Sequence, residues 1–381
     1  MATSVNWSFP TPIRFGAGRI SELGEACQSV GMQNPLLVTD RGLASLPITG
    51  KALDLMEGAG FARALFGEVD QNPNEINLAK GLKAYADGNH DGIIAFGGGS
   101  GIDLAKMIAF MCGQTRPVWD FEDIGDWWTK ADSDLIAPII AIPTTAGTGS
   151  EVGRASVLTN SKTLQKKIIF HPKVMPSIVI SDPELTVGMP PMITAGTGMD
   201  AFAHCLEAYC SPHFHPMAQG IALEGMRLIK NNLHNAYVDG ADIEARSQML
   251  VAATMGATAF MKGLGAIHAL SHPIGAHHNT HHGTTNAVVM QPVLRFNKAA
   301  VVDRLSDASA YLGLQGGFNS FYDYVGELNQ SLNIPENLTS LGVIDPNMDT
   351  LVMDALIDPS VGGNPTEMTQ TNTRALLESC F

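Results

Sequence analysis

The residues with the clearest chemical potential are histidines that are concentrated in one stretch. Residues 265–288 read GAIHALSHPIGAHHNTHHGTTNAV, which holds six of the twelve histidines in the chain. These six are His268, His272, His277, His278, His281 and His282. Imidazole nitrogens bind divalent metals and carry protons near neutral pH. The stretch therefore predicts a metal site, a proton-transfer site, or both.

A metal site needs ligands that converge, and the chain offers two pairs with helical spacing. GMDAFAHCLEAY places Asp200 and His204 four residues apart, and His268 and His272 form a second such pair. Side chains at i and i+4 project from one face of a helix, close enough to hold one ion. A single pair is also what an ordinary helix-surface contact looks like, but two pairs together favour a metal site.

The remaining histidines follow the second pair. His282 lies fourteen residues after His268, beyond Pro273 and Gly275, which predict that the helix is kinked or ends there. One carboxylate and several imidazoles, on two helices and a following turn, can form a divalent-metal cage. Six histidines cannot all bind one ion. We therefore expect three of them to line the pocket or to support the ligands: His277, His278 and His281.

A glycine-rich turn is the second chemical feature. GGGSGID, residues 97–103, follows the apolar run IIAF and precedes DLAKMIAF. Glycines let a backbone approach a phosphate, and the N-terminus of the following helix offers N–H donors and a positive dipole. The motif is neither GxGxxG nor a Walker A sequence, and it could also be a plain strand–helix turn. Its context in an alternating half of the chain favours nucleotide binding.

Asp40 ends the apolar run PLLVTD, residues 35–40. A carboxylate at the end of the second strand of a dinucleotide fold hydrogen-bonds the adenosine ribose, and it would repel a 2′-phosphate. The alternative is an aspartate that caps a helix or closes a turn.

Helices and strands must position these motifs, and the two halves of the chain have different patterns of apolar residues. Short apolar runs alternate with helical segments up to about residue 185, which is typical of a parallel α/β sheet. The rest carries apolar residues at i, i+3 and i+4 and is predicted to be helical. Prolines and a glycine cluster in the turn DPELTVGMPP, residues 182–191. We predict an NAD-binding α/β domain over 1–185 and a helical metal-binding domain over 186–381.

Composition excludes several classes of function. The net charge of −14 makes nucleic acid and anionic membranes poor partners, because both reward clustered Lys and Arg. No run approaches 18 apolar residues, and the N-terminus lacks the pattern of a signal peptide. Five scattered cysteines without CxxC spacing suggest reduced thiols, and hence a cytoplasmic location.

The motifs together resemble the iron-containing (group III) alcohol dehydrogenase family over essentially the whole chain. They are GGGSGIDLAK, IPTTAGTGSEV, DPELTVGMPP, GTGMDAFAHCLEAY, GLGAIHALSHPIGAHHNTHHGTTNAV and GGNPTEMT. The resemblance implies the dehydroquinate synthase-like fold: an α/β dinucleotide-binding domain with a parallel sheet, an all-α C-terminal domain, and a site in the cleft between them. A homo-oligomer, namely a dimer, is expected.

The resemblance also implies roles for individual residues. The metal ligands it implies are Asp200, His204, His268 and His282, with His272 in the site but not bound to the metal. The NAD contacts it implies are Asp40, Gly97, Gly98, Gly99, Ser100, Thr144, Thr145 and Lys166. The metal it implies is Fe²⁺, whereas three imidazoles and a carboxylate favour Zn²⁺ in raw affinity, and some relatives use zinc.

Two departures from the family pattern leave the substrate open. Residues 151–154 read EVGR, where many members have a threonine before the arginine. Position 262 is a lysine, where several members have a small or amide residue. Lys262 could anchor the far carboxylate or sulfonate of a substrate, which would suggest a short ω-hydroxy acid or its semialdehyde. Alternatively, Lys262 caps the C-terminus of a helix.

The predicted reaction is hydride transfer between a primary alcohol, or its aldehyde, and NAD(H). The metal acts as a Lewis acid on the alcohol oxygen, and His272 is the candidate proton relay. His272 could instead be a hydrogen-bonded structural histidine. There are two rival functions. The first is a non-redox, NAD- and metal-dependent cyclase like dehydroquinate synthase, which would need clusters of basic residues that are scarce around these histidines. The second is a metal-binding protein without catalysis.

Overall fold

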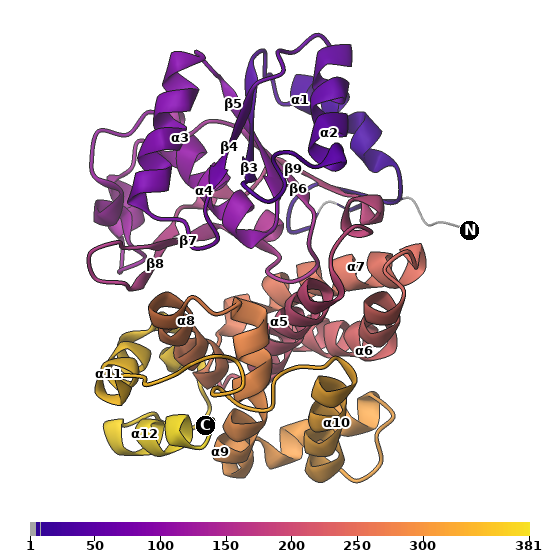
Figure 1. Cartoon of the computed structure of the whole chain (residues 1–381), viewed down its shortest axis with the longest axis vertical. Coiled ribbons are helices and arrows are strands. Elements are labelled where there is room, and N and C mark those ends of the chain that lie inside the picture. Colours follow the sequence, from indigo (N-terminus) through magenta and orange to yellow (C-terminus); the bar gives the residue numbers. More distant parts are fainter. Residues whose placement is uncertain (1–4, 8) are drawn as a thin grey trace. The chain divides into compact units, whose positions relative to one another are not determined.

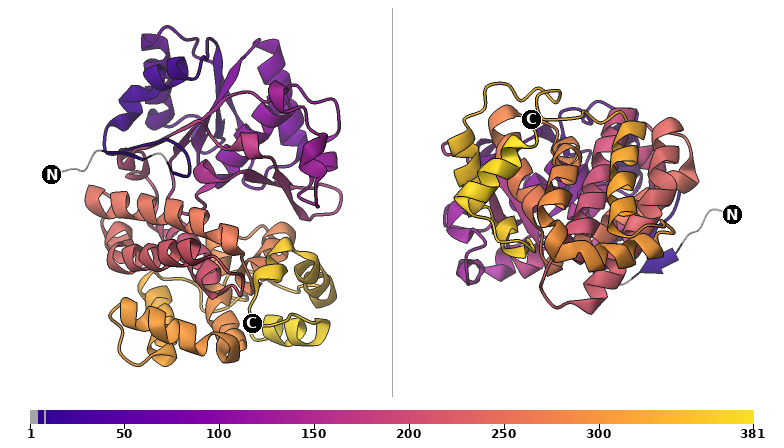
Figure 2. Two further views of the ribbon diagram at one scale, coloured as in Figure 1. Left: turned by 180° about the vertical axis from the view of Figure 1, so that it is seen from behind. Right: turned by 90° about the horizontal axis from the view of Figure 1, so that it is seen from below.

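The structure is a computed structural model, and it describes residues 5–7 and 9–381. The chain forms two compact units, shown in indigo to magenta and in red to yellow (Figures 1 and 2). The first unit ends at Val187 and excludes Ala146–Thr148, which belongs with Gly188–Phe381 in the second. The assignment of NAD to residues 1–185 and of the metal to residues 186–381 stays a prediction.

The first unit is built on a seven-stranded sheet with the order β1-β2-β9-β6-β5-β3-β4, in which only the β1–β2 pair is antiparallel. Its strands are β1 (Val5–Trp7), β2 (Ile13–Phe15), β3 (Pro35–Asp40), β4 (Leu65–Val69), β5 (Gly92–Gly97), β6 (Ile139–Pro143) and β9 (Ile178–Ser181). A separate hairpin pairs β7 (Ala155–Thr159) with β8 (Lys166–Phe170). The helices of this unit are α1 (Leu23–Ser29), α2 (Pro47–Gly58), α3 (Glu75–Asp87) and α4 (Gly99–Met111).

The central strands are apolar on both faces because helices cover both faces. Successive strand residues point to opposite sides of a sheet. Leu37, Ile94 and Ile140 therefore share one face, where they form a core with residues of α1 and α2 such as Leu23 and Met56. Their neighbours on the opposite face are equally buried, and α3 and α4 lie on that side of the sheet in Figure 1. The predicted parallel α/β sheet is confirmed.

The strand order creates a switch point between β3 and β5. From β3 the chain goes outward to β4 and then returns to β5 on the other side of β3. The connections that leave the carboxyl ends of β3 and β5 therefore run in opposite directions. In open α/β sheets, ligands bind at such a point, outside the carboxyl ends of the strands. Asp40 ends β3 and Gly97 ends β5, so both lie at this position.

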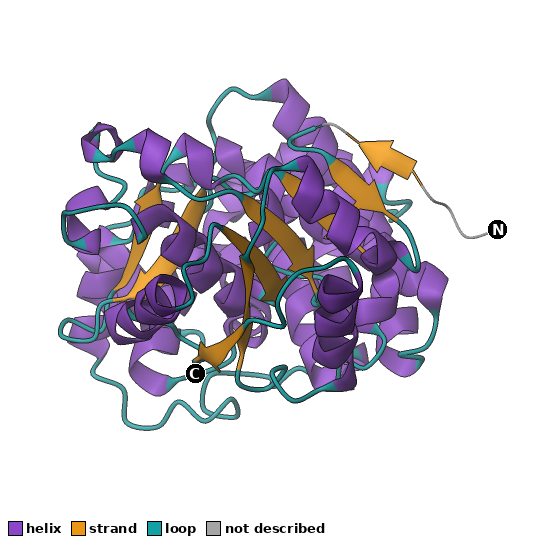
Figure 3. Cartoon of the chain, turned by 90° about the horizontal axis from the view of Figure 1, so that it is seen from above, coloured by secondary structure: helices purple, strands orange, loops and turns teal. Residues whose placement is uncertain are grey.

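The second unit is helical, as predicted, and the last strand in the described chain ends at Ser181 (Figure 3). Its helices are α5 (Pro191–Cys210), α6 (Pro216–Val238), α7 (Ile243–Ala259), α8 (Ala266–His278), α9 (His282–Tyr311), α10 (Phe318–Ser331), α11 (Met348–Ile357) and α12 (Gln370–Glu378). Helix α5 is the centre of this unit, because every residue from Thr194 to Cys210 is buried. It packs against α6, α7 and α9. Because α5 is covered in this way, its polar side chains, such as Asp200, His204 and Glu207, must find partners inside the unit.

The sequence predicts that the histidine-bearing helix is kinked or ends at Pro273 or Gly275, and the second of these alternatives is wrong. Helix α8 continues through both residues to His278. A proline removes only its own N–H from the helix, and buried packing of Ile274 and Gly275 holds the following turn. The helix ends where Asn279 adopts a left-handed conformation with φ of 52°.

Within the described residues, no single helix is long and apolar enough to cross a membrane. Ile243–Lys262 and Ala266–His278 meet the length and composition limits only when they are taken as a pair, and this pair is bent by 108°.

Candidate active site

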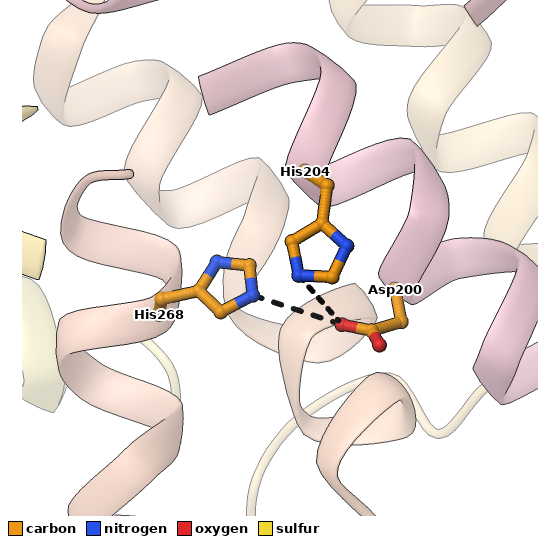
Figure 4. Close-up of side chains that lie close together, drawn as sticks. All are labelled: Asp200, His204 and His268. Carbon is orange, nitrogen blue, oxygen red and sulfur yellow. Dashed lines mark ion pairs between the residues drawn. The ribbon is translucent and has the colours of Figure 1, made fainter. Parts of the chain in front are cut away.

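Helix α5 carries the first two predicted metal ligands. Asp200 and His204 are one turn apart and share a face, as their spacing predicts. Both are buried, and His204 Nε2 lies 3.8 Å from Asp200 Oδ1 (Figure 4). Because α5 is buried from Thr194 to Cys210, these polar groups lie inside the helical unit.

Helices α8 and α9 bring two more imidazoles to the same carboxylate oxygen. The Nε2 atoms of His268 and His282 lie 3.7 Å and 3.4 Å from Asp200 Oδ1. His282 can reach this oxygen because α9 crosses α5 without intervening side chains. A Cβ added at Gly283 would lie 2.0 Å from the carbonyl oxygen of Gly196, so the crossing requires glycine.

The four side chains fit a divalent metal. Three Nε2 atoms surround Asp200 Oδ1 at 3.4–3.8 Å. The edges of a tetrahedron around a metal with bonds of about 2.1 Å are about 3.4 Å long. The ligand atoms of Asp200, His204 and His268 also lie within 4.8 Å of one another. Three imidazoles and one carboxylate are a donor set suited to Fe²⁺ or Zn²⁺.

The protonation states of this cluster also suit a cation. Burial alone would raise the pKa of Asp200, but the surrounding histidines outweigh it and hold that pKa below its ordinary value. Burial lowers the pKa of His204 to about 4, so this ring is neutral at pH 7. Burial also acts to lower the pKa of His268, but the Glu207 and Asp200 carboxylates prevail and raise it to about 9. A metal that bound His268 near neutrality would therefore release a proton.

Asn286 is a further member of the cluster, which sequence reasoning missed. It is fully buried on α9, one turn after His282. Its Nδ2 donates to Asp200 Oδ1 at 2.8 Å and lies 3.3 Å from the Nε2 atoms of His268 and His282. Asn286 therefore fixes the carboxylate that all three imidazoles share. Its i, i+4 spacing from His282 was the available signal.

His272 packs against two of the predicted ligands. Its ring stacks on that of His282, with centroids 5.3 Å apart, and meets the ring of His268 edge-on at 5.7 Å. Its Nδ1 lies 2.8 Å from Asp358 Oδ2. Burial acts to raise the pKa of Asp358, but His272 and the Ser360 N–H outweigh it and lower that pKa. An ionised Asp358 thus orients His272, and sequence reasoning missed it.

The other three histidines do not share one role. His277 Nε2 lies 2.9 Å from Asp354 Oδ2, in α11. His281 is the N-cap of α9, where its Nδ1 accepts the Thr284 N–H, and its place in the pocket lining or in support of the ligands stays a prediction. His278 is half-buried in the last turn of α8, and burial followed by the nearby His277 lowers its pKa.

Lys262 caps a helix, which was one of its two predicted roles. It ends the 3₁₀ helix η8 (Phe260–Lys262) and is 2% exposed. Its Nζ donates to the carbonyl oxygens of Ala208, Tyr209 and Ser211, at 2.9, 3.1 and 2.8 Å. These carbonyls close the C-terminus of α5, where a cation is favoured by the helix dipole. All three ammonium protons are used, so the alternative of a substrate anchor loses its basis.

In the first unit, Asp40 and the glycine turn lie together at the switch point of the sheet. Asp40 Oδ1 accepts the N–H of Leu43 at 3.0 Å, so the residue does close a turn. Its other oxygen faces the glycines, since a Cβ added at Gly97 would lie 3.5 Å from Oδ2. Gly97 also has a φ of 150°, which side chains rarely adopt. The turn and nucleotide interpretations of Asp40 are therefore compatible.

The N-terminus of α4 is open to a ligand. Its N-cap, Gly98, supplies no side chain to the free N–H groups, which leaves them for an anion such as a phosphate. Thr144 and Thr145 follow β6, next to β5 in the sheet. A Cβ at Gly98 would come within 3.2 Å of Thr145, and the buried Thr144 Oγ1 has no hydrogen-bond partner among the described residues. These features fit a nucleotide.

Two of the predicted NAD contacts are placed differently. The hydroxyl of Ser100 donates to the carbonyl of Gln71 at 2.5 Å. Lys166 lies in the β7–β8 hairpin, opposite Thr159 and outside the seven-stranded sheet. Its positive charge acts on Asp103 of α4, where it opposes the rise in pKa that burial causes. Their contact with NAD stays a prediction.

Comparison with known proteins agrees with this fold. The family model described as iron-containing alcohol dehydrogenase matches residues 10–183, and the model of the C-terminal part of Fe-containing alcohol dehydrogenases matches residues 194–381. The chain is 38% identical to a 4-hydroxybutyrate dehydrogenase of Cupriavidus necator, with 97% of each chain covered. It is 33% identical to a 1,3-propanediol dehydrogenase of Klebsiella pneumoniae, with 96% of each covered. A crystal structure of a 1,3-propanediol oxidoreductase has a TM-score of 0.92 at 32% identity, covering 100% of both chains.

A parallel sheet with an open glycine turn and a helical unit with a cluster that fits a divalent metal agree with the class of these relatives, the metal-dependent, NAD-linked alcohol oxidoreductases. The chain belongs to the iron-containing alcohol dehydrogenase family. The resemblance, the fold class and the reaction class predicted from the sequence are thereby confirmed.

Proposed function

We propose that this enzyme interconverts a short ω-hydroxy acid and its semialdehyde, using NAD(H) and a divalent metal held by Asp200, His204, His268 and His282. The observation that carries the metal site is the convergence of three Nε2 atoms on Asp200 Oδ1. The substrate class is supported by the 4-hydroxybutyrate dehydrogenase to which the chain is similar over 97% of its length. It draws no support from Lys262, whose donors are all bound to carbonyls.

When bound, the metal would supply Lewis acidity that lowers the pKa of the alcohol hydroxyl, and NAD⁺ would be the hydride acceptor. The residues of the chain provide the remaining functions. Asn286 holds the Asp200 carboxylate in place. His272, bound through Nδ1 to Asp358, keeps Nε2 for the proton that leaves the alcohol. Asp200, His204 and His268 are buried, whereas the side chain of His282 is partly exposed.

The proposed relay predicts a selective loss of turnover. His272→Asn replaces the imidazole with an amide and leaves no proton-accepting nitrogen at the position of Nε2. This change should lower kcat about 100-fold, the usual scale for a general acid–base group. The metal content should stay at the wild-type value, because the four ligands remain. Steady-state kinetics and metal analysis of the same preparation check this. A fall in kcat of less than about threefold would show that His272 is structural.

Asp40 predicts a preference for NAD(H) over NADP(H), because its Oδ2 would repel a 2′-phosphate. Asp40→Gly should reduce the ratio of kcat/KM with NAD(H) to kcat/KM with NADP(H) by at least about tenfold. Relieving about 1.4 kcal/mol of like-charge repulsion has that effect. The gain should come mainly from the KM for NADP(H). Asp40→Asn is the matched control, because it removes the charge while its amide oxygen can still accept the Leu43 N–H. A wild type that prefers NADPH would contradict this assignment of Asp40.

The same proposal includes Fe²⁺ as the native metal, a cytoplasmic location and a dimer. Iron is supported by the family, while the donor set also suits zinc. All five cysteines are free, which supports a reducing compartment such as the cytoplasm. A dimer of this 40.5 kDa chain would be seen directly by light scattering.

The decisive experiment measures NAD⁺ reduction by metal-loaded enzyme with 4-hydroxybutyrate, 1,3-propanediol and 1-butanol. We expect absorbance of the reduced cofactor to rise with all three, with the highest kcat/KM for 4-hydroxybutyrate. Activity that is equal or greater with 1-butanol would overturn the substrate class while leaving the reaction class intact. Metal binding without NAD⁺ reduction on any alcohol would overturn the proposed redox function.

A further inference from the structure

Glu207 is a buried carboxylate next to the predicted metal ligands that has no part in the proposed reaction. It lies on α5, three residues after His204, and is 6% exposed. Its Oε2 lies 2.5 Å from Nδ1 of His268, the ring nitrogen opposite to the one that faces Asp200. A buried carboxylate is costly unless hydrogen bonds satisfy it, so its placement calls for a role.

The other oxygen of Glu207 binds the start of α8. Oε1 accepts the N–H of Ile267 at 2.7 Å and is 3.4 Å from the N–H of His268. The N-cap of α8, Gly265, has no side chain that could accept these donors. A carboxylate from α5 therefore caps α8, in the position where a negative charge is favoured by the helix dipole. One side chain thus fixes both the backbone and the ring of His268.

We infer that Glu207 is a positioning residue that sets the tautomer and the orientation of His268 for metal binding, an inference that rests on the proposed metal site. By accepting a hydrogen bond from Nδ1–H, Glu207 favours the neutral tautomer in which the proton stays on Nδ1 and Nε2 carries a free lone pair. That lone pair points toward the cluster around Asp200. Carboxylates that hold the second nitrogen of a metal-bound histidine also raise its basicity, and removing them typically weakens metal binding about 10- to 100-fold.

A purely structural role for Glu207 can be separated from positioning, because α8 has a second cap. The N–H of Ala266 donates to Asn364 Oδ1 at 3.1 Å, and Asn364 exchanges two amide hydrogen bonds with Asn297. Asn364 therefore supports the same helix end as Glu207, and its hydrogen bonds among the described residues go to Ala266, Asn297 and Thr366 rather than to His268. Its loss should affect stability but not the tautomer of the ring.

The test compares Glu207→Gln with Asn364→Ala. In Glu207→Gln the amide oxygen can still accept the Ile267 N–H, while the amide N–H₂ is turned toward Nδ1 of His268. This favours the tautomer with its proton on Nε2, which cannot bind a metal. We expect the Kd for Zn²⁺, measured by competition with a chromogenic chelator at pH 7, to rise about 10- to 100-fold. Asn364→Ala should lower the Tm but keep the Kd within about threefold of the wild type, since it leaves the Glu207–His268 contact intact.

Each outcome decides between the proposals. Wild-type protein that binds no Zn²⁺ would refute the metal site itself. A wild type that binds Zn²⁺ and a Glu207→Gln variant within threefold of it would refute the positioning role alone. Equal losses of affinity in both variants would assign the effect to the helix end and also refute it. If Glu207→Gln does not fold, Glu207→Asp is measured in the same way. Its shorter side chain withdraws the carboxylate from Nδ1, so an unchanged Kd would overturn the inference.

Discussion

His282→Ala should lose the bound metal and at least about 1,000-fold of kcat/KM, while the protein stays folded. Removing one of four ligands breaks the cage around Asp200 Oδ1, and without the metal the alcohol is not activated. His282 is the best ligand to remove, because its side chain is 27% exposed and its main partner is Asp200. Metal analysis, circular dichroism and NAD⁺ reduction on one preparation check the three parts of this result.

His268→Ala would be a poorer test, although this residue is the more buried ligand. It would leave the Glu207 carboxylate buried without its partner, which typically costs about 3–5 kcal/mol and could unfold the protein. His277→Ala is the matched control for His282→Ala, since its side chain is 23% exposed and it pairs with Asp354. The control should keep metal and activity. Full activity of His282→Ala, or of wild type freed of metal by chelation, would refute the metal site.

The sequence predicted those parts of the site that depend on short spacing. Asp200 and His204 are one turn apart on α5, so their shared face followed from helix geometry. The contacts missed were those between segments distant in the chain. His272 meets Asp358 across 86 residues, and His268 meets Glu207 across 61. No local pattern encodes such pairs. Glu207, however, is three residues after His204 and could have been tested as part of the same face.

The fold was predictable for a similar reason. The buried strands β3, β5, β6 and β9 are continuous apolar runs, and the sequence marks each of them clearly. The β7–β8 hairpin and β4 were missed, because their residues are only partly buried and their apolar pattern is weak. Of the two alternatives predicted at Pro273, a kink or a helix end, the end is wrong, because α8 continues to His278 where tertiary packing overrides the preference of proline.

The close crossing of α5 and α9 could not be predicted from the sequence. Gly283 lets His282 approach Asp200, yet a glycine between a histidine and a threonine does not indicate which helix it will meet. The four predicted metal ligands lie on three helices, α5, α8 and α9, and the spacing within each helix could not show that these helices meet.

The second large effect is expected from a substitution of Lys262, and it concerns the stability of the fold. Lys262→Met keeps the apolar stem but removes the donors that satisfy the C-terminal carbonyls of α5. Arg304 still donates to the carbonyls of Tyr209 and Ser211, but the Ala208 carbonyl loses its bond to Lys262. We expect the free energy of unfolding to fall by about 2 kcal/mol, within the range for leaving buried polar groups unsatisfied. Chemical denaturation, with the exposed Lys298→Met as control, checks this; the control should change by less than about 0.5 kcal/mol.

The same variant decides what Lys262 does for the substrate. If its ammonium only closes α5, the ratio of kcat/KM for 4-hydroxybutyrate to that for 1-butanol should stay within about twofold of the wild type, because both substrates would be affected alike. An ammonium that held the carboxylate would instead give a selective loss with 4-hydroxybutyrate of at least about tenfold, the equivalent of about 1.4 kcal/mol. The three carbonyl contacts, at 2.8–3.1 Å, leave no ammonium proton for such a bond. A selective loss would therefore mean that Lys262 leaves the α5 carbonyls when substrate binds, and the unchanged ratio is the expected result.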